Sequence, residues 1–279
     1  MSALAEAKRS FYRTEQVAQA YDRQRFGGVS GAYVNERELA AVAALLPAHV
    51  GVIADIGAGT GRLLPLLQAR ADRVLALDAS MAMLRQAHEK TPAQSQTAPA
   101  RHEHRGPFEP GPTGSGPQAR ARAGGRAAPQ GLSPRSGTMP ALIQADGFSL
   151  PITTSALDAA TCMRVLFHFD DPGSLLRELR RVVKPGGVLV ADTAAWSPRG
   201  LLPLGRGRWG EHVVTMSRAR FRALARASGW QVQEDRAGFL ISPYMYRRLP
   251  LRWAQALEGL EPHLPRPLLC RVFWRLTPA

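Results

Sequence analysis

Residues 52–64 of this 279-residue chain read Val52-Ile53-Ala54-Asp55-Ile56-Gly57-Ala58-Gly59-Thr60-Gly61-Arg62-Leu63-Leu64. A short apolar run meets a glycine cluster, after which apolar residues recur at helical spacing. The pattern predicts a buried strand, a tight turn and a helix. Glycines suit such a turn because they adopt positive φ angles freely and let a ligand approach the backbone. The helix that follows would offer unpaired N–H groups to that ligand.

The spacing of the glycines argues against two common ligands. A dinucleotide fingerprint requires G-x-G-x-x-G, but here the third glycine comes one residue early and Arg62 takes its place. A phosphate-binding loop would need Gly-Lys-Ser/Thr after the glycines, and this turn lacks it. Asp55, two residues before Gly57, would repel a pyrophosphate and attract an ammonium group. Together these features indicate an adenosine ligand that carries an amino acid.

The stretch Asp55-Ile56-Gly57-Ala58-Gly59-Thr60-Gly61 resembles the first motif of class I S-adenosylmethionine-dependent methyltransferases. Within that class the chain is similar to the small-molecule type, which includes the ubiquinone/menaquinone group. The resemblance implies an enzyme with S-adenosylmethionine as cofactor. It also implies a Rossmann-like α/β fold, a doubly wound seven-stranded sheet whose last strand is antiparallel. Within the turn it assigns cofactor binding to Asp55, Gly57, Ala58, Gly59 and Gly61. For the turn taken alone, an ordinary glycine-rich connection remains the alternative.

A second acid ends the next expected strand, residues 73–78. Asp78 lies 21 residues after Gly57, the right reach for one carboxylate to accept hydrogen bonds from both ribose hydroxyls. By resemblance, Ala79 and Met83 flank the adenine in a D-x-S-x-x-M-L pattern. Core packing is the alternative for Met81 and Met83, and only one of the two is expected to touch the cofactor.

A third acid follows the third expected strand, residues 141–148. An acid at this point can accept a hydrogen bond from the adenine amino group, and the next backbone N–H can donate to a ring nitrogen. Asp146 and Gly147 match that position in the family.

The N-terminal segment 17–23 is similar to the part of these enzymes that folds over the cofactor. We expect helices over 3–26 and 35–46, and together residues 1–48 form a helical cap. By the resemblance, Tyr21 packs on the cofactor and Arg25 reaches its carboxylate. Tyr21 as a merely buried helix residue is an equal alternative.

The fourth expected strand, residues 157–166, leads into a loop that contains a histidine. Ligands of doubly wound sheets bind beyond the carboxyl ends of the strands, so Met163, Arg164 and His168 should lie near the transferred methyl group. We assign Met163 to the cofactor. A histidine titrates near neutral pH, which suits His168 as a general base. His168 as a simple pocket wall is an equal alternative.

The C-terminal part resembles the family weakly. We expect a helix over 174–184, a Lys-Pro-Gly-Gly turn, strands over 188–193, 230–233 and 271–276, and a helix over 217–228. The methyltransferase domain then comprises residues 49–90 and 141–279. Two segments that contain several prolines, 196–208 and 239–264, are interpreted as walls of the acceptor pocket. An aromatic core is an equal alternative for them. The aromatic residues in or beside these segments are Trp209, Tyr244, Tyr246 and Trp253.

The amino-acid composition further limits the class of protein to which the chain can belong. With 45% hydrophobic residues and no apolar run near the length of a membrane span, a globular cytoplasmic protein without a transmembrane segment is expected. Cys162 and Cys270 lack metal-ligand spacing, so we predict no metal. The net charge of +14 is compatible with a basic face for nucleic acid or an anionic membrane, although a solvated surface is the favoured interpretation. Nothing in the sequence indicates an oligomeric state.

Three functions follow from these patterns. The favoured one is methyl transfer to an oxygen, nitrogen or carbon atom of a small-molecule acceptor. A nucleic-acid methyltransferase is the first alternative, but no Asn/Asp-Pro-Pro-Tyr/Phe motif follows the fourth strand and no RNA-binding module is visible. The second alternative is a non-catalytic scaffold that retains the cofactor-binding fold.

Residues 91–140 interrupt the pattern. Proline and glycine supply 17 of these 50 positions, and aliphatic and aromatic residues almost vanish. Such a segment cannot bury enough apolar surface to offset its ordering entropy, so we interpret it as a disordered insertion. Relatives of this family cross here in a few residues, which makes the insertion a departure. A basic tether for a partner and an inert expansion are the two roles considered.

We predict that residues 93–137 are dispensable. Replacing them with a short Gly/Ser linker should leave the melting temperature and the cofactor affinity unchanged, because the composition cannot contribute to a core. Thermal unfolding and cofactor titration measure the two quantities. A collapse of either one would show that the segment is structural.

Overall fold

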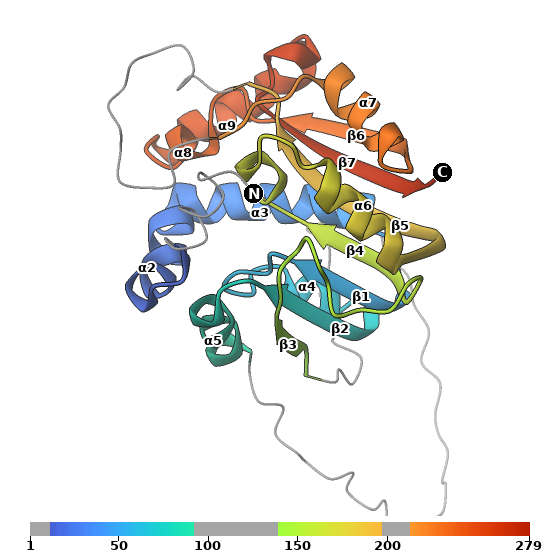
Figure 1. Ribbon diagram of the computed structural model, residues 1–279. Helices are drawn as coiled ribbons and strands as arrows, with labels where there is room; N and C mark the ends of the chain where they lie inside the picture. Colours follow the sequence, from blue (N-terminus) through green and yellow to red (C-terminus); the bar gives the residue numbers. More distant parts are fainter. Residues whose placement is uncertain (1–11, 92–138, 197–212) are drawn as a thin grey trace, which may run out of the picture.

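A computed structural model describes residues 12–91, 139–196 and 213–279. Within these ranges seven strands form one sheet in the order β3-β2-β1-β4-β5-β7-β6. The pairs from β3 through β5 are parallel, while β7 runs antiparallel to β5 and β6. The predicted doubly wound sheet with an antiparallel last strand is confirmed (Figure 1). The strands are β1 Val50–Ile56, β2 Ala71–Asp78, β3 Ala141–Gln144, β4 Leu157–Cys162, β5 Val183–Ala194, β6 Trp230–Gly238 and β7 Arg271–Pro278.

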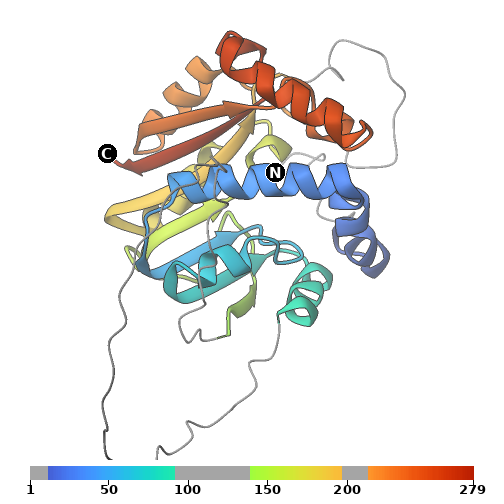
Figure 2. The ribbon, with the colours of Figure 1, turned by 180° about the vertical axis from the view of Figure 1, so that it is seen from behind.

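Helices cover both faces of the sheet. In Figure 1, α6 and α7 lie over the face toward the viewer, whereas Figure 2 shows α3, α4 and α9 over the opposite face. The helices are α2 Glu15–Phe26, α3 Val29–Leu45, α4 Leu64–Gln68, α5 Met81–Lys90, α6 Gly173–Val182, α7 Arg218–Ala227, α8 Pro243–Tyr246 and α9 Leu251–Leu260, with short 3₁₀ turns η1 Leu166–His168, η3 Glu261–His263 and η4 Arg266–Leu268.

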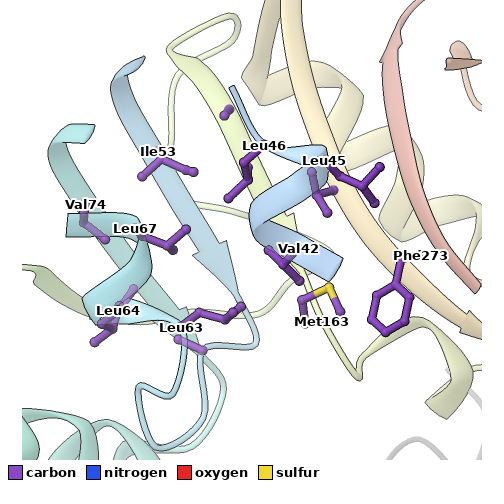
Figure 3. Packing of buried hydrophobic residues seen from close by; sticks show 14 of the residues in the cluster. Val42, Leu45, Leu46, Ile53, Leu63, Leu64, Leu67, Val74, Met163 and Phe273 are labelled. Atoms are coloured by element: carbon purple, nitrogen blue, oxygen red, sulfur yellow. The ribbon is translucent and has the colours of Figure 1, made fainter. Parts of the chain in front are cut away.

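Residues of the central strands alternate between two cores. In β5, Val188 and Val190 belong to the core beneath α3 and α4, whereas Leu189 and Ala191 belong to the core beneath α6 and α7. This period of two places apolar side chains on both faces, as a largely parallel sheet requires. Figure 3 shows the first core, where Val42 of α3 lies between Ile53 of β1 and Phe273 of β7.

The chain order reverses between β1 and β4, which are hydrogen-bonded neighbours. From β1 the chain proceeds outward to β2 and β3, and it then returns to β4 on the other side of β1. At such a reversal the connections leave the sheet in opposite directions and a crevice opens beyond the carboxyl ends of the strands. The glycine turn and the loop after β4 therefore face each other.

Two segments differ from their predicted bounds for visible reasons. Strand β4 ends at Cys162 instead of residue 166, because Arg164 has a positive φ of 62° and its backbone N–H donates to the Asp192 carboxylate of β5. Helix α3 starts at Val29 instead of residue 35. Gly28, with a φ of 74°, turns the chain so sharply that α2 and α3 are separated by only two glycines.

The Lys-Pro-Gly-Gly turn belongs to the start of β5. The pairing of β4 with β5 shifts from Leu157 opposite Val183 to Ala159 opposite Val188, which accommodates the extra residues as a bulge. Gly186 has a φ of 79° within it.

Three sequence expectations lie outside the described residues: the helix start before residue 12, the insertion between 92 and 138, and the segment 197–212 with Trp209. In the described part of the chain, no helix has the length and apolarity needed to cross a bilayer.

Candidate functional site

A pocket of about 190 Å³ opens at the carboxyl ends of β1, β2 and β4. Every residue predicted for the site lines this pocket except Gly61. The lining residues are Tyr12, Tyr21, Asp55, Ile56, Gly57, Ala58, Gly59, Thr60, Arg62, Leu63, Leu77, Asp78, Ala79, Ser80, Met83, Ala145, Asp146, Gly147, Phe148, Leu150, Met163, Arg164, Val165, His168, Phe169 and Leu175.

The glycine turn forms the floor beyond β1. The N–H groups of Gly57 and Ala58 donate to the carbonyl of Leu77, at 2.7 and 3.0 Å, and bind the turn to β2. Gly59 has a φ of 55°, and a Cβ built there would have no neighbour nearer than 4.0 Å. The backbone at Gly59 is therefore open to a ligand, as the sequence predicted.

Gly61 does not line the pocket, and its assignment to the cofactor stays a prediction. A Cβ at Gly61 would come within 2.8 Å of the Ala87 Cβ and 2.9 Å of a Leu64 methyl group, and its φ is 77°. This glycine permits the turn to pack against α5. Close packing and ligand approach both require a missing side chain, so the sequence pattern does not separate them.

Asp78 is held firmly at the end of β2. Its two carboxylate oxygens accept the N–H groups of Gly59 and Ser80, both at 2.8 Å. Burial raises the pKa of Asp78, and these two hydrogen bonds oppose the rise. Each carboxylate oxygen retains a further lone pair, so Asp78 can still accept hydrogen bonds from a ligand.

Asp55 of β1 is a buried acid whose pKa is strongly raised. Its side chain is 2% exposed and accepts a 2.7 Å hydrogen bond from the Thr161 hydroxyl of β4. Burial raises its pKa to about 6, against the opposing effects of Thr161 and Arg62. A cationic ligand beside Asp55 would favour the ionised carboxylate.

The far wall is apolar with one acid. Met83 is 3% exposed and lines the pocket, whereas Met81 is 42% exposed, so Met83 is the methionine available to a ligand. Phe148 packs edge-on against Phe169 with ring centroids 4.9 Å apart. The carboxylate of Asp146 accepts the N–H of Phe148 at 3.1 Å, which shapes the turn after β3.

The segment around α2 roofs the pocket. Tyr12 and Tyr21 meet edge-on at 6.2 Å, and the Ser80 hydroxyl donates to the Tyr12 carbonyl at 2.7 Å. The Thr60 hydroxyl donates to Asp22 at 2.6 Å, so α2 is bonded directly to the glycine turn. Sequence reasoning did not assign Tyr12, Thr60 and Ser80 to the site. Thr60 and Ser80 lie within the two recognised motifs, whereas Tyr12 belongs to no motif.

Arg25 and two of the aromatic residues predicted for the acceptor walls do not line the pocket. Arg25 is 8% exposed, donates to the Tyr12 hydroxyl at 3.4 Å and does not line the pocket. Tyr246 is fully buried and donates to Glu261 at 2.8 Å, whereas Trp253 is 56% exposed. Neither aromatic residue lines the pocket, and the interpretation of their segment as an acceptor wall stays a prediction.

His168 lies in η1, just past β4. Its ring centroid is 6.0 Å from that of Tyr12 and 4.8 Å from that of Phe167, and it lines the pocket together with Met163 and Arg164. The predicted proximity of these residues to the glycine turn is therefore observed. Among the described residues, no cluster of three or more histidine, cysteine or acidic side chains could hold a metal ion.

A buried ion cluster behind the pocket was not predicted from sequence. Glu38 of α3 has no exposed surface and contacts three guanidinium groups: Arg164 at 2.9 Å, Arg62 at 3.0 Å and Arg271 at 3.7 Å. Arg271 also pairs with the buried Asp192 of β5. Burial alone would raise the pKa of Glu38, but the three arginines outweigh it and lower that pKa to about 2.

Comparison with known protein families gives a match that covers most of the chain. A family profile described as a methyltransferase domain matches residues 21–235. An uncharacterized methyltransferase of Mycolicibacterium vanbaalenii is 29% identical over 132 residues, which are 47% of this chain and 48% of that relative. A ubiquinone biosynthesis O-methyltransferase of Xanthomonas oryzae pv. oryzae is 31% identical over 107 residues, 34% of this chain and 43% of that enzyme. The chain spans about half the length of these curated relatives.

The fold has solved counterparts. Magnesium protoporphyrin IX methyltransferase from Synechocystis PCC 6803, solved with bound SAH, superposes with a TM-score of 0.56 at 15% identity. The superposition covers 99% of this chain and 100% of that one. At this identity the likeness shows the shared fold.

We predict that Glu38→Gln lowers the free energy of unfolding near neutral pH by about 3–5 kcal/mol, the scale for removing one partner of a buried ion cluster. The folded-state pKa of Glu38 lies near 2, below its ordinary 4.5. Its stabilising contribution is therefore complete above the ordinary pKa and is lost as the pH falls toward 2. Urea unfolding of both proteins should show a gap that narrows when the pH is lowered to about 4.

Glu36→Gln is the matched control, because Glu36 is exposed on the same helix. We expect it to change the stability by less than about 0.5 kcal/mol. Equal losses in the two variants, or a gap that does not depend on pH, would contradict the role of Glu38.

Proposed function

The chain belongs to the methyltransferase domain family, and from this we propose that it transfers a methyl group from S-adenosylmethionine to a small-molecule acceptor. One observation carries the proposal: the pocket joins the glycine turn to Asp55, Asp78 and Asp146 from three neighbouring strands. That series provides one acid for each polar part of an adenosine ligand with an amino-acid tail.

The residues present fit this cofactor. Asp78 accepts the ribose hydroxyls through the lone pairs that Gly59 and Ser80 leave available. Asp55 pairs with the ammonium group, which favours its charged form. In the same proposal, Asp146 and Gly147 take the edge of the adenine, which lies against Ala79 and Met83. The open backbone at Gly59 leaves room for the chain between ribose and amino acid.

When bound, the cofactor supplies an electrophilic methyl group on a sulfonium. The protein then has to align the acceptor and exclude water. We assign that task to Tyr12, Tyr21 and Phe169, which wall the pocket around Met163. His168 is the proposed general base, which removes the acceptor's proton at an imidazole nitrogen.

Two observations support a small acceptor. The rings of Tyr12 and Tyr21 line the pocket together with His168, so aromatic surface is available to a small acceptor there. The Xanthomonas relative is named for O-methylation in ubiquinone biosynthesis, a small-molecule reaction. A nucleic-acid acceptor and a non-catalytic scaffold are the alternatives. Transfer of a radiolabelled methyl group into cell extract, with small molecules and polymers separated afterwards, distinguishes all three.

We predict that the purified protein binds S-adenosylhomocysteine and that Asp78→Ala weakens this binding by about 1.5–3 kcal/mol, the scale for hydrogen bonds to a charged group. Isothermal titration calorimetry measures both affinities. Asp72→Ala, at the exposed opposite end of β2, is the matched control and should bind like the wild type.

Binding of a nicotinamide dinucleotide in place of S-adenosylhomocysteine would reject the cofactor assignment. An unchanged dissociation constant in folded Asp78→Ala would reject the ribose role alone.

For His168, we predict that His168→Ala lowers kcat by about 10²–10⁴ while the affinity for S-adenosylhomocysteine stays intact. The loss should shrink at high pH if the acceptor's own hydroxyl or amine then ionises. Steady-state kinetics with the identified acceptor measure this. A rise in KM with activity recovered by His168→Asn or His168→Gln would instead identify a pocket wall. A change of only a few-fold in every variant would show that no base is needed.

A further inference from the structure

Exposed apolar side chains are concentrated in one segment of the chain. Among the described residues, seven large apolar side chains are exposed, and four of these come from the segment 243–268. The four are Met245, Trp253, Leu260 and Leu268, with exposed fractions between 46% and 56%. Concentrations of this kind mark interaction sites more often than scattered apolar residues do.

Helix α9 has two apolar faces instead of one. Its inner face packs Ala254, fully buried, and Leu257 against the core beneath α3. Its outer face carries Trp253, Ala256 and Leu260, which are all exposed and lie three and four residues apart. Residues at this spacing share one side of a helix, so they form a continuous apolar stripe directed at solvent.

Cations surround this stripe. Arg248 and Arg252 are exposed beside it, and the Arg252 guanidinium lies 5.9 Å from the Trp253 ring centroid. The two acids of the same region, Glu258 and Glu261, are both engaged by Arg37 of α3. The surface around the stripe is therefore positively charged.

The chain between α8 and α9 is bonded to the start of α3. The Ser30 hydroxyl at the start of α3 donates to the Leu249 carbonyl between α8 and α9, at 2.6 Å. Val29, beside Ser30, is 69% exposed and adds to the apolar surface. Figures 1 and 2 both show α8 beside the end of α3 that joins α2.

We propose that the α9 face, defined as Met245, Arg248, Arg252, Trp253, Ala256 and Leu260, docks on an anionic lipid surface. An amphipathic helix with tryptophan and leucine on one side and arginines beside them lies in the interface of such a membrane. The apolar stripe enters the headgroup boundary while the arginines pair with lipid phosphates. Each arginine near the surface adds to the binding energy.

Two other partners fit the face less well. Nucleobases need successive aromatic side chains on which to stack, and Trp253 is the single aromatic residue in the defined face, beside leucine, methionine and alanine. A twofold dimer built on this face would bring Arg248 and Arg252 of both copies into one interface, and the defined face contains no acid to balance these four charges. An anionic bilayer can bury the apolar stripe and also pair its phosphates with the arginines.

The full-length protein is tested by co-sedimentation with vesicles of phosphatidylcholine alone or mixed with phosphatidylglycerol. We expect binding to the anionic vesicles only, weakened by added salt. Arg248→Gln/Arg252→Gln should lower the partition coefficient by about thirtyfold at low ionic strength. Trp253→Ser/Leu260→Ser should abolish sedimentation by removing the inserted side chains.

Arg220→Gln/Arg226→Gln on α7 is the matched control, because it removes the same charge from exposed positions on another helix. It should sediment like the wild type. Melting temperature and affinity for S-adenosylhomocysteine, measured for every variant, separate a loss of docking from a loss of folding or of cofactor binding.

The proposal is overturned if no vesicle is bound, or if all variants bind equally. It is also overturned if gel filtration shows a dimer that Trp253→Ser/Leu260→Ser dissociates, or if an RNA oligomer binds this face and the vesicles do not. Loss of sedimentation in both α9 variants, with the α7 variant unaffected, supports it.

Discussion

A single carboxylate joins the parts of the chain that surround the pocket. Glu38 is in α3, and its three arginines follow the glycine turn, follow β4 and begin β7. Without that carboxylate, three guanidinium groups would be left together in the buried interior, where Asp192 pairs with Arg271 alone of the three. Phe26, at the end of α2, packs its ring against Arg62 and Arg164, so the roof of the pocket rests on the same cluster. The location of α2 and the geometry after β4 therefore depend on one buried charge.

Much of the fold followed from the sequence because its signals are local. A few neighbouring residues are enough to predict a strand, a glycine turn or an acid at the end of a strand. Since parallel strands place their carboxyl ends on one edge, Asp55, Asp78 and Asp146 had to converge there once the sheet order was known. The structure brings them to one pocket. Their roles toward the cofactor remain predictions.

The rest could not be predicted because it depends on contacts between distant segments. Glu38 sits four residues from both Val34 and Val42 on the buried side of α3, and an acid on an apolar stripe was the available signal. Its partners, however, lie in three other segments and share no motif. Tyr246 and Trp253 show the same limit, because aromatic composition does not say which way a side chain points. One is buried in the core and the other faces solvent.

Arg164 carries a consequence for how this position can vary. A non-glycine residue in the left-handed region costs about 1–2 kcal/mol, and Arg164 has a φ of 62°. Glycine would relieve this strain, yet it would take a guanidinium away from Glu38 and from the hydroxyl of Tyr21. Lysine would keep the charge but lack the planar fork that reaches two acceptors at once. Each substitution at this position therefore has a cost: glycine removes the backbone strain but also the positive charge, and lysine keeps both the charge and the strain but loses the planar contact. We expect both substitutions to be selected against as the sequence diverges.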